Sequence, residues 1–264
     1  SSILLILFTG TSLAASVVYR QGITNDFVSN YTGTDDTFIT SFNPSFNYGG
    51  GDSSGDRTAW IGTGLTGNSS SRSLIRFDLS SFAGQYRRVT SVSLSLNVSS
   101  ASSLVGVVNL HQLSSANSGW VEGTGRGVVQ AGSSSWNHPS STQSAWAGAP
   151  GATLAGVDFI STPLASSQFS PGSRGLEFSF AGSSESLTQL IDLWTTPGNP
   201  GIVLSSEDPI SLTFRTSERF FPTLGVLPPT LTIGFEAIPE PGVFLLSIGS
   251  CVILFARRSC PLQN

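Results

Sequence analysis

Charged side chains are scarce in this chain. Asp, Glu, Lys and Arg make up 11% of its 264 residues, whereas a typical soluble protein has about 25%. Glycine, serine and threonine fill the difference, which is common in extracellular β proteins, where every second strand residue faces water. The net charge is −4, and Arg87-Arg88 is the only basic pair before the C-terminal segment. Without a basic stripe to follow a phosphate backbone, we expect no nucleic-acid partner.

Cysteine and methionine are also nearly absent. The two cysteines, Cys251 and Cys260, both lie in the C-terminal segment, so the chain before that segment can form no internal disulfide. Its stability must come from packing, hydrogen bonding or a bound ion, because no covalent cross-link restrains it. Methionine does not occur at all, position 1 included, and we expect the native chain to start upstream of Ser1.

The residues and motifs of common active sites are missing as well. There are two histidines, His111 in a strand-like stretch and His138 in a loop, and there is no Gly-x-Ser-x-Gly turn, phosphate-binding loop or histidine-rich metal spacing. Glycosidases need two carboxylates that face one sugar. The sequence alone pairs none of the available acids, which include Glu122, Asp158, Glu177, Asp192 and Glu218. We therefore predict that the protein is not an enzyme, and a polysaccharide-degrading enzyme remains the alternative.

A hydrophobic segment near the C-terminus is the clearest positive signal. Pro239-Glu240-Pro241 comes first, an apolar run of 14 residues follows at 243–256, and Arg257-Arg258 ends it. A helix that spans a bilayer needs about 20 apolar residues, so this run is short for a permanent anchor and suits a transient sorting signal. An ordinary single-pass anchor is the alternative. In either case, Arg257 and Arg258 would keep that end cytoplasmic.

The order of these three features resembles the PEP-CTERM sorting signal of exported Gram-negative envelope proteins. The resemblance covers residues 239–258. It implies that an exosortase-type membrane protease recognises Pro239, Glu240 and Pro241, cleaves nearby, and leaves the product released or attached at the cell surface. We expect residues 237–264 to be the sorting and membrane segment of a protein of the cell envelope or extracellular matrix.

The other end of the chain carries a second export signal. An apolar run at 3–8 leads into Thr-Gly-Thr-Ser-Leu-Ala-Ala at 9–15, which is typical of the hydrophobic core and small-residue cleavage site of a secretory signal peptide. We predict a signal peptide over 1–15, cut after Ala14 or Ala15. A buried first strand is the alternative interpretation.

Residues 16–236, between the two signals, are predicted to form one β domain. Apolar and polar residues alternate in several stretches, which is the pattern of half-buried antiparallel strands. The stretches lie at 75–79, 92–98, 176–180, 212–214 and 231–235, with shorter candidates at 37–40, 59–62, 105–113 and 201–205. Helical spacing of apolar residues occurs once, from Leu187 to Trp194, and predicts one short helix. The long stretch 114–170 should be functional or hold irregular structure of its own.

A series of short motifs runs through this domain. In order they are Asp36-Thr37-Phe38-Ile39, Asn47-Tyr48-Gly49, Trp60-Ile61-Gly62, Ser73-Leu74-Ile75-Arg76-Phe77-Asp78-Leu79-Ser80, Val92-Ser93-Leu94-Ser95-Leu96, Gly119-Trp120-Val121-Glu122-Gly123, Ser135-Trp136-Asn137, Asn199-Pro200-Gly201-Ile202-Val203-Leu204, Arg215-Thr216-Ser217-Glu218 and Pro229-Thr230-Leu231-Thr232-Ile233. Their order is similar to that of the DNRLRE family of secreted domains, some of which are carbohydrate-binding modules. The resemblance implies an all-β fold, a jelly-roll-like antiparallel β-sandwich.

Three tryptophans are candidate carbohydrate contacts. Trp120, Trp136 and Trp146 lie in the long stretch 114–170. A tryptophan offers a flat apolar face and one N–H donor, which suits stacking on a sugar ring as well as filling a core. Trp146 stands between two alanines in a glycine-rich context, so it is the one that we expect to be exposed.

Four aspartates are candidate ligands of a structural calcium ion. Asp35, Asp36, Asp52 and Asp56 lie near loops rich in glycine and hydroxyl side chains. Carboxylate and carbonyl oxygens are the ligands that calcium prefers. The alternative is that these acids are simply solvated.

The sequence as a whole predicts an exported, exosortase-sorted β-sandwich protein of the cell surface or extracellular matrix, with a structural or adhesive role. The alternative function is that of a carbohydrate-binding module for envelope or environmental polysaccharide. No cofactor is required by either function, apart from the candidate calcium ion.

Overall fold

The fold is all-β, with antiparallel strands and one short α-helix. The computed structural model describes residues 14–51, 57–63, 69–140, 145–218 and 227–238. The described part contains 11 strands, and every pairing between them is antiparallel. This agrees with the alternation of apolar and polar residues in the sequence, since that pattern is typical of antiparallel strands with one buried face.

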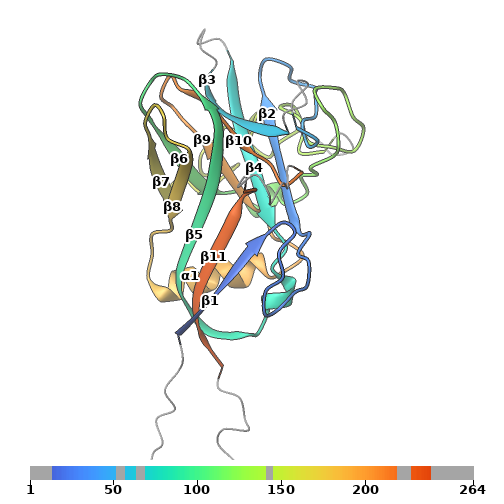
Figure 1. Cartoon of the computed structure of the whole chain (residues 1–264). Coiled ribbons are helices and arrows are strands. Elements are labelled where there is room, and N and C mark those ends of the chain that lie inside the picture. The colour runs from blue at the N-terminus through green and yellow to red at the C-terminus, as the bar shows by residue number, and fades with distance from the viewer. Residues whose placement is uncertain (1–13, 52–56, 64–68, 141–144, 219–226, 239–264) are drawn as a thin grey trace, which may run out of the picture.

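The elements follow one another along the chain, and Figure 1 labels them. They are β1 (Ala14–Arg20), β2 (Thr34–Thr40), β3 (Thr58–Thr63), β4 (Ser70–Phe77), β5 (Tyr86–Ala101), β6 (Gly106–Gln112), β7 (Ala165–Phe169), β8 (Gly175–Ser179), α1 (Ser184–Trp194), β9 (Ile202–Ser205), β10 (Ser211–Arg215) and β11 (Thr230–Ala237).

Strand β5 connects two groups of strands. Along residues 86–95 it pairs with β11, which in turn pairs with β1, and along residues 93–97 it pairs with β8. At its far end, from Val98 to Ala101, it pairs instead with β10. From β10 the hydrogen-bonded order continues through β3, β4, β9, β6 and β7, with β2 on the other side of β4. In Figure 1, β5 is the long green strand that runs down most of the molecule.

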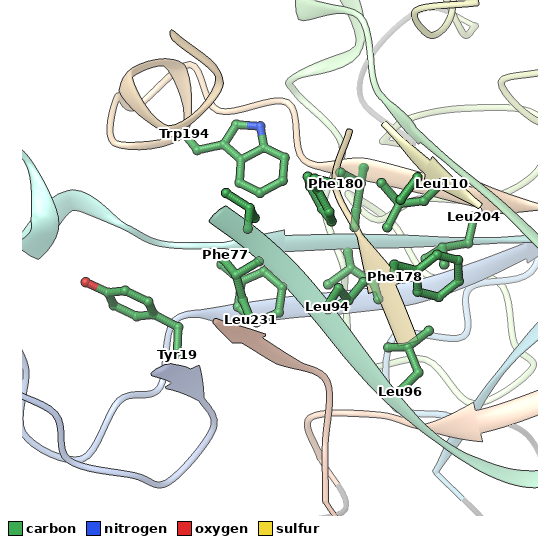
Figure 2. Packing of buried hydrophobic residues seen from close by; sticks show 14 of the residues in the cluster. Tyr19, Phe77, Leu94, Leu96, Leu110, Phe178, Phe180, Trp194, Leu204 and Leu231 are labelled. Atoms are coloured by element: carbon green, nitrogen blue, oxygen red, sulfur yellow. The ribbon is translucent and has the colours of Figure 1, made fainter. Parts of the chain in front are cut away.

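One large hydrophobic core joins the two groups. Leu94, Phe178 and Leu231 reach it from β5, β8 and β11, and Leu110 and Leu204 reach it from β6 and β9. Figure 2 shows these side chains directed toward one another. None of the five has any exposed surface. Four of the five are inward members of stretches in which apolar and polar residues alternate, so the period of two places each of them on the buried face of its strand. Leu204 differs, because all four residues of β9 are buried.

A second hydrophobic cluster lies on the other face of β2, β4 and β9. Ile39, Leu74 and Val203 come from these strands, and their neighbours along the chain belong to the large core. They pack against side chains of the loop between β6 and β7, residues 113–164, among them Trp120 and Trp146. In Figure 1 this loop lies beside β2. The long stretch therefore does hold irregular structure of its own, as its composition predicts.

The helix α1 confirms the one helical pattern in the sequence. Ser183 caps its start by accepting a hydrogen bond from the backbone N–H of Ser186, 3.2 Å away. Its buried residues are those with helical spacing, Leu187, Leu190, Ile191 and Trp194. Thr188 ties the helix to β5 because its hydroxyl accepts the backbone N–H of Val89 over 2.9 Å.

Two strands were not predicted from the sequence. β1 falls where the cleavage site and the start of the domain are expected, and its Val17 and Tyr19 belong to the large core. β7 falls inside the stretch that is expected to be irregular, and only its end residues, Ala165 and Phe169, are buried. Both strands are fixed by partners far along the chain, β11 and β6, so their local patterns are weak.

The first and last described strands are neighbours. Ala14 is paired with Glu236, so the chain enters and leaves the β-sheet at the same place. Residues 1–13 and 239–264, which hold most of the predicted signal peptide and sorting segment, lie outside the described residues. Within the described ranges, no helix has the length and hydropathy that crossing a bilayer requires.

Replacing Leu94 by alanine should strongly destabilise the fold. The side chain is fully buried at the centre of β5, and deleting a buried leucine costs about 2–5 kcal/mol of unfolding free energy. Leu104→Ala removes the same atoms from a side chain that is 45% exposed, and should cost less than about 0.5 kcal/mol. Urea denaturation measures both variants, and equal losses would show that the core is assigned incorrectly.

Candidate functional site

Three carboxylates from distant parts of the chain meet inside the protein. Asp36 lies on β2, Glu122 lies in the β6–β7 loop, and Glu218 follows β10. One carboxylate oxygen of each lies within 4.8 Å of the others. Asp36 has no exposed surface, and the other two are partly buried. We call this group the acidic trio.

Hydrogen bonds fix one oxygen of each acid and leave others without a partner. Glu122 Oε1 accepts the backbone N–H of Asp36 over 2.7 Å, and Asp36 Oδ2 accepts the backbone N–H of Ser217 over 2.7 Å. Glu218 Oε1 accepts the Ser217 hydroxyl over 3.0 Å. Asp36 Oδ1 and Glu218 Oε2 are buried and have no hydrogen-bond partner. The trio is therefore held in place yet retains buried acceptor atoms that nothing satisfies.

Asp158 shows what a satisfied buried carboxylate looks like in the same protein. It also has no exposed surface. Its Oδ1 accepts from the Asn117 amide over 3.0 Å and from the backbone of Gly148 over 2.8 Å, and its Oδ2 accepts from the backbones of Ala149 and Leu154 over 3.0 and 2.9 Å. Four donors surround Asp158, so its charge is stabilised by the loop that it organises. Each acid of the trio accepts from one such donor instead of four.

Proximity and burial disfavour three negative charges in the trio. The pKa of Glu122 is raised to about 11, chiefly by burial and next by the neighbouring carboxylates of Asp36 and Glu218. Burial, followed by the charge of Glu218, raises the pKa of Asp36 well above its usual range. Among the salt bridges that described residues make with one another, none includes a member of the trio. Without a cation, at least some of these groups must therefore hold protons at neutral pH.

The structure separates two of the four aspartates of the predicted calcium site, Asp35 and Asp36. Asp36 is part of the trio, whereas Asp35 is directed to the opposite side of β2, as adjacent residues of a strand are. There Asp35 Oδ2 accepts from Nη2 and Nε of Arg76 over 2.6 and 3.0 Å. Asp52 and Asp56 lie outside the described residues.

The trio brings together acids that the sequence left unpaired. Glu122 and Glu218 are among the carboxylates noted in the sequence, but they lie 86 and more residues from Asp36. Only the pairing of strands brings them together. One signal for them is present in the sequence, because Glu122 lies in the motif 119–123 and Glu218 in the motif 215–218 of the series described above.

The three candidate tryptophans serve the structure of the loop. Trp120 is 1% exposed and Trp146 is 3% exposed, and both belong to the second hydrophobic cluster, against which Trp136 also packs. The indole N–H of Trp120 donates to the carbonyl of Pro200 over 2.8 Å, and that of Trp146 donates to Ser135 over 3.1 Å. The prediction that Trp146 is exposed is therefore wrong, because its ring fills the interior of the glycine-rich loop.

Trp60 on β3 is the exposed tryptophan. It is 39% exposed, and its ring stacks on Phe38 with a centroid separation of 6.1 Å and an interplanar angle of 14°. Phe38 in turn stacks on Tyr48 at 4.2 Å. In the sequence, Trp60 stands in the candidate strand 59–62, where alternate residues are expected to face inward. The structure places its side chain on the outer end of an aromatic stack.

A cleft of about 430 Å³ opens beside the Arg76–Asp35 pair. Asp78 and Asn199 also line it, together with Trp194 from the end of α1. The guanidinium group of Arg76 lies over the ring of Trp120, with its central carbon 4.6 Å from the ring centroid. The cleft therefore presents charged groups in fixed positions.

His111 is buried in β6 beside the second hydrophobic cluster. It is 7% exposed, its Nδ1 lies 2.9 Å from the carbonyl oxygen of Ile160, and its ring meets Phe159 edge-on at 4.7 Å. A carbonyl can only accept, so Nδ1 carries the hydrogen. Burial lowers the pKa of His111 below its usual 6.5, and the charge of Arg72 lowers it further.

Acid should weaken the fold through His111. Because its pKa is lower in the folded protein, the unfolded chain takes up a proton first as the pH falls below about 6.5, and stability falls with it. Glutamine retains an N–H donor for Ile160 but does not titrate. Between pH 7.5 and pH 5.5, the wild type should therefore lose more stability in urea than the His111→Gln variant. Parallel pH profiles for the two proteins would contradict this assignment.

Comparisons with known proteins add no relative. No protein-family model matches the chain, and no curated protein is found to be similar to it. The resemblances to the PEP-CTERM signal and to DNRLRE domains therefore stay predictions that depend on the residues quoted for them.

Proposed function

We propose that this chain is an exported protein that an exosortase sorts to the cell surface or extracellular matrix, where it has a structural or adhesive role. The sequence supports this proposal through an apolar segment at each end, Pro239-Glu240-Pro241, and the terminal Arg257-Arg258. The β domain between these segments contains no cysteine, so it needs no oxidation step to fold after export.

The proposed architecture is a jelly-roll-like β-sandwich. Two groups of antiparallel strands, β1-β11-β5-β8 and β10-β3-β4-β9-β6-β7, contribute to one hydrophobic core. Packing two sheets through alternate inward side chains is the construction of a sandwich. The strand β5 takes part in both groups, as strands do at the corners of such folds.

The pairing of β1 with β11 is the observation that best supports sorting. Ala14 and Glu236 are partners across these strands, so both export segments connect to one end of the domain. A protease acting near Pro239 would cut beyond the last strand, since β11 ends at Ala237. Processing at either end would therefore leave the core side chains of both strands in place.

Changing Pro239-Glu240-Pro241 to three alanines should block processing. In a Gram-negative host that has an exosortase, the wild type should appear as a shortened product at the surface or in the medium. The triple variant should remain full-length in the membrane fraction. Immunoblots of fractionated cells, with mass spectrometry of the C-terminus, measure the difference.

Pro171→Ala is the matched control, because Pro171 is an exposed turn residue outside the motif. This variant should be processed like the wild type. A full-length wild-type chain in the cytosol would contradict the proposal, and so would equal processing of the triple variant.

A carbohydrate-binding role is the second candidate, and the exposed face of Trp60 favours it. An aromatic ring held flat by stacked neighbours is a suitable surface for a sugar, because little side-chain entropy is lost on binding. Trp60 meets this condition through Phe38 and Tyr48. A polysaccharide-degrading role finds less support at the acidic trio, because Asp36 has no surface that a substrate could reach.

If the second role holds, Trp60→Ala should weaken binding on an array of acidic and neutral glycans by about tenfold or more, the usual loss for a central aromatic contact. Phe42→Ala removes a ring that is 75% exposed and takes no part in the stack, so it should bind like the wild type. Trp146→Ala should lower the melting temperature instead. Absence of wild-type binding to every glycan would leave the structural role alone.

A further inference from the structure

We propose that Asp36, Glu122 and Glu218 bind one calcium ion, which links β2, the β6–β7 loop and the segment after β10. This site goes beyond the proposed function and does not depend on sorting. It also differs from the predicted calcium site, with which it shares Asp36 alone.

The unsatisfied oxygen of Asp36 is the first reason. Asp36 is completely buried, its Oδ2 is fixed by Ser217, and its Oδ1 has no hydrogen-bond partner. Leaving a buried acceptor unsatisfied is costly, and more so when it is charged. Glu218 Oε2 is a second buried oxygen without a partner, in the same cluster. Both atoms are available to one ligand that carries positive charge.

The spacing of the three carboxylates is the second reason. Their oxygens lie within 4.8 Å of one another. Ligands that contact one Ca²⁺ at about 2.3–2.6 Å lie at most about 5 Å apart, so this spacing is compatible with one ion between the three carboxylates. The donor set contains oxygen alone, which suits a hard cation and argues against zinc, whose structural sites use cysteine and histidine. Magnesium prefers a tighter octahedral shell that retains several waters.

The supports of the site are already in place. The backbone N–H of Asp36 holds Glu122, and the hydroxyl of Ser217 holds Glu218. These groups orient the carboxylates in the way that outer-shell partners orient metal ligands.

Calcium itself is the probe for the test, with the full chain purified in a mild detergent. The protein is stripped with EDTA and titrated with Ca²⁺ by calorimetry, and its melting temperature is recorded with EDTA and with calcium. We expect one ion per chain and a higher melting temperature with calcium, since a ligand that binds only the folded state stabilises it. Magnesium at the same concentration should raise the melting temperature less.

The variant Glu122→Gln separates a metal site from a proton-sharing cluster. In calcium it should bind the ion at least about tenfold more weakly, the loss that even outer partners of a metal produce. In EDTA it should melt near the wild-type temperature, because the glutamine amide still offers an oxygen to the backbone N–H of Asp36 and the trio does not carry three negative charges without a cation. Glu177→Gln, an exposed change on β8, should leave both the affinity and the melting temperature unchanged.

Two results would overturn the proposal. One is a stripped wild type whose melting temperature does not respond to calcium and that binds none in the titration, which would mean that the trio retains its protons. The other is calcium binding that Glu122→Gln and Asp36→Asn leave intact, which would place the ion elsewhere, for example at Asp52 and Asp56. The titration measures calcium binding directly. A variant that does not fold shows no melting transition, and Glu218→Gln then takes its place in the test.

Discussion

The burial of one face of β5 is the constraint on which the rest of the fold depends. Val92, Leu94 and Leu96 are all nearly or fully buried, while both edges of the same segment form hydrogen bonds, with β11 and with β8. A one-residue slip of β5 would turn its apolar face outward and break the register with every partner at once. The domain contains no disulfide, so this packing carries the role that a covalent cross-link has in many exported proteins.

The second cluster turns the outer face of β2, β4 and β9 into an interior as well. Two arginines of β4 lie at this face, and each needs partners once it is covered. Arg72 donates to the carbonyl of Ala152 over 3.1 Å. Arg76 forms an ion pair with Asp35 and lies over the ring of Trp120. The β6–β7 loop supplies the carbonyl of Ala152 and the ring of Trp120, so the loop is held on the sheet by these contacts as well as by apolar burial. Its glycine-rich sequence permits the close turns that this requires.

Local sequence patterns were sufficient to predict the elements that bury only one face. The alternation in β5, β8, β10 and β11 and the helical spacing in α1 each appear in a few consecutive residues, because their burial has a short period. β1 and β7 were missed because pairing with β11 and β6 defines them. The acidic trio was missed for the same reason, since Asp36 and Glu122 lie 86 residues apart and only the strand order brings them together. Trp146 was misplaced because composition does not reveal which ring closes a loop.

Asp36 and Asp158 show why hydrogen bonding, more than burial, identifies a ligand site. Both carboxylates are fully buried, in a chain with few charged residues. Four N–H groups surround Asp158, so the loop itself balances its charge. Asp36 has one such donor and two acidic neighbours, so its charge is balanced only by a proton or by a cation. A cation there would join three segments between which the domain has no covalent cross-link. Its contribution to stability would be largest outside the cell, where calcium reaches the millimolar range in which extracellular modules bind it.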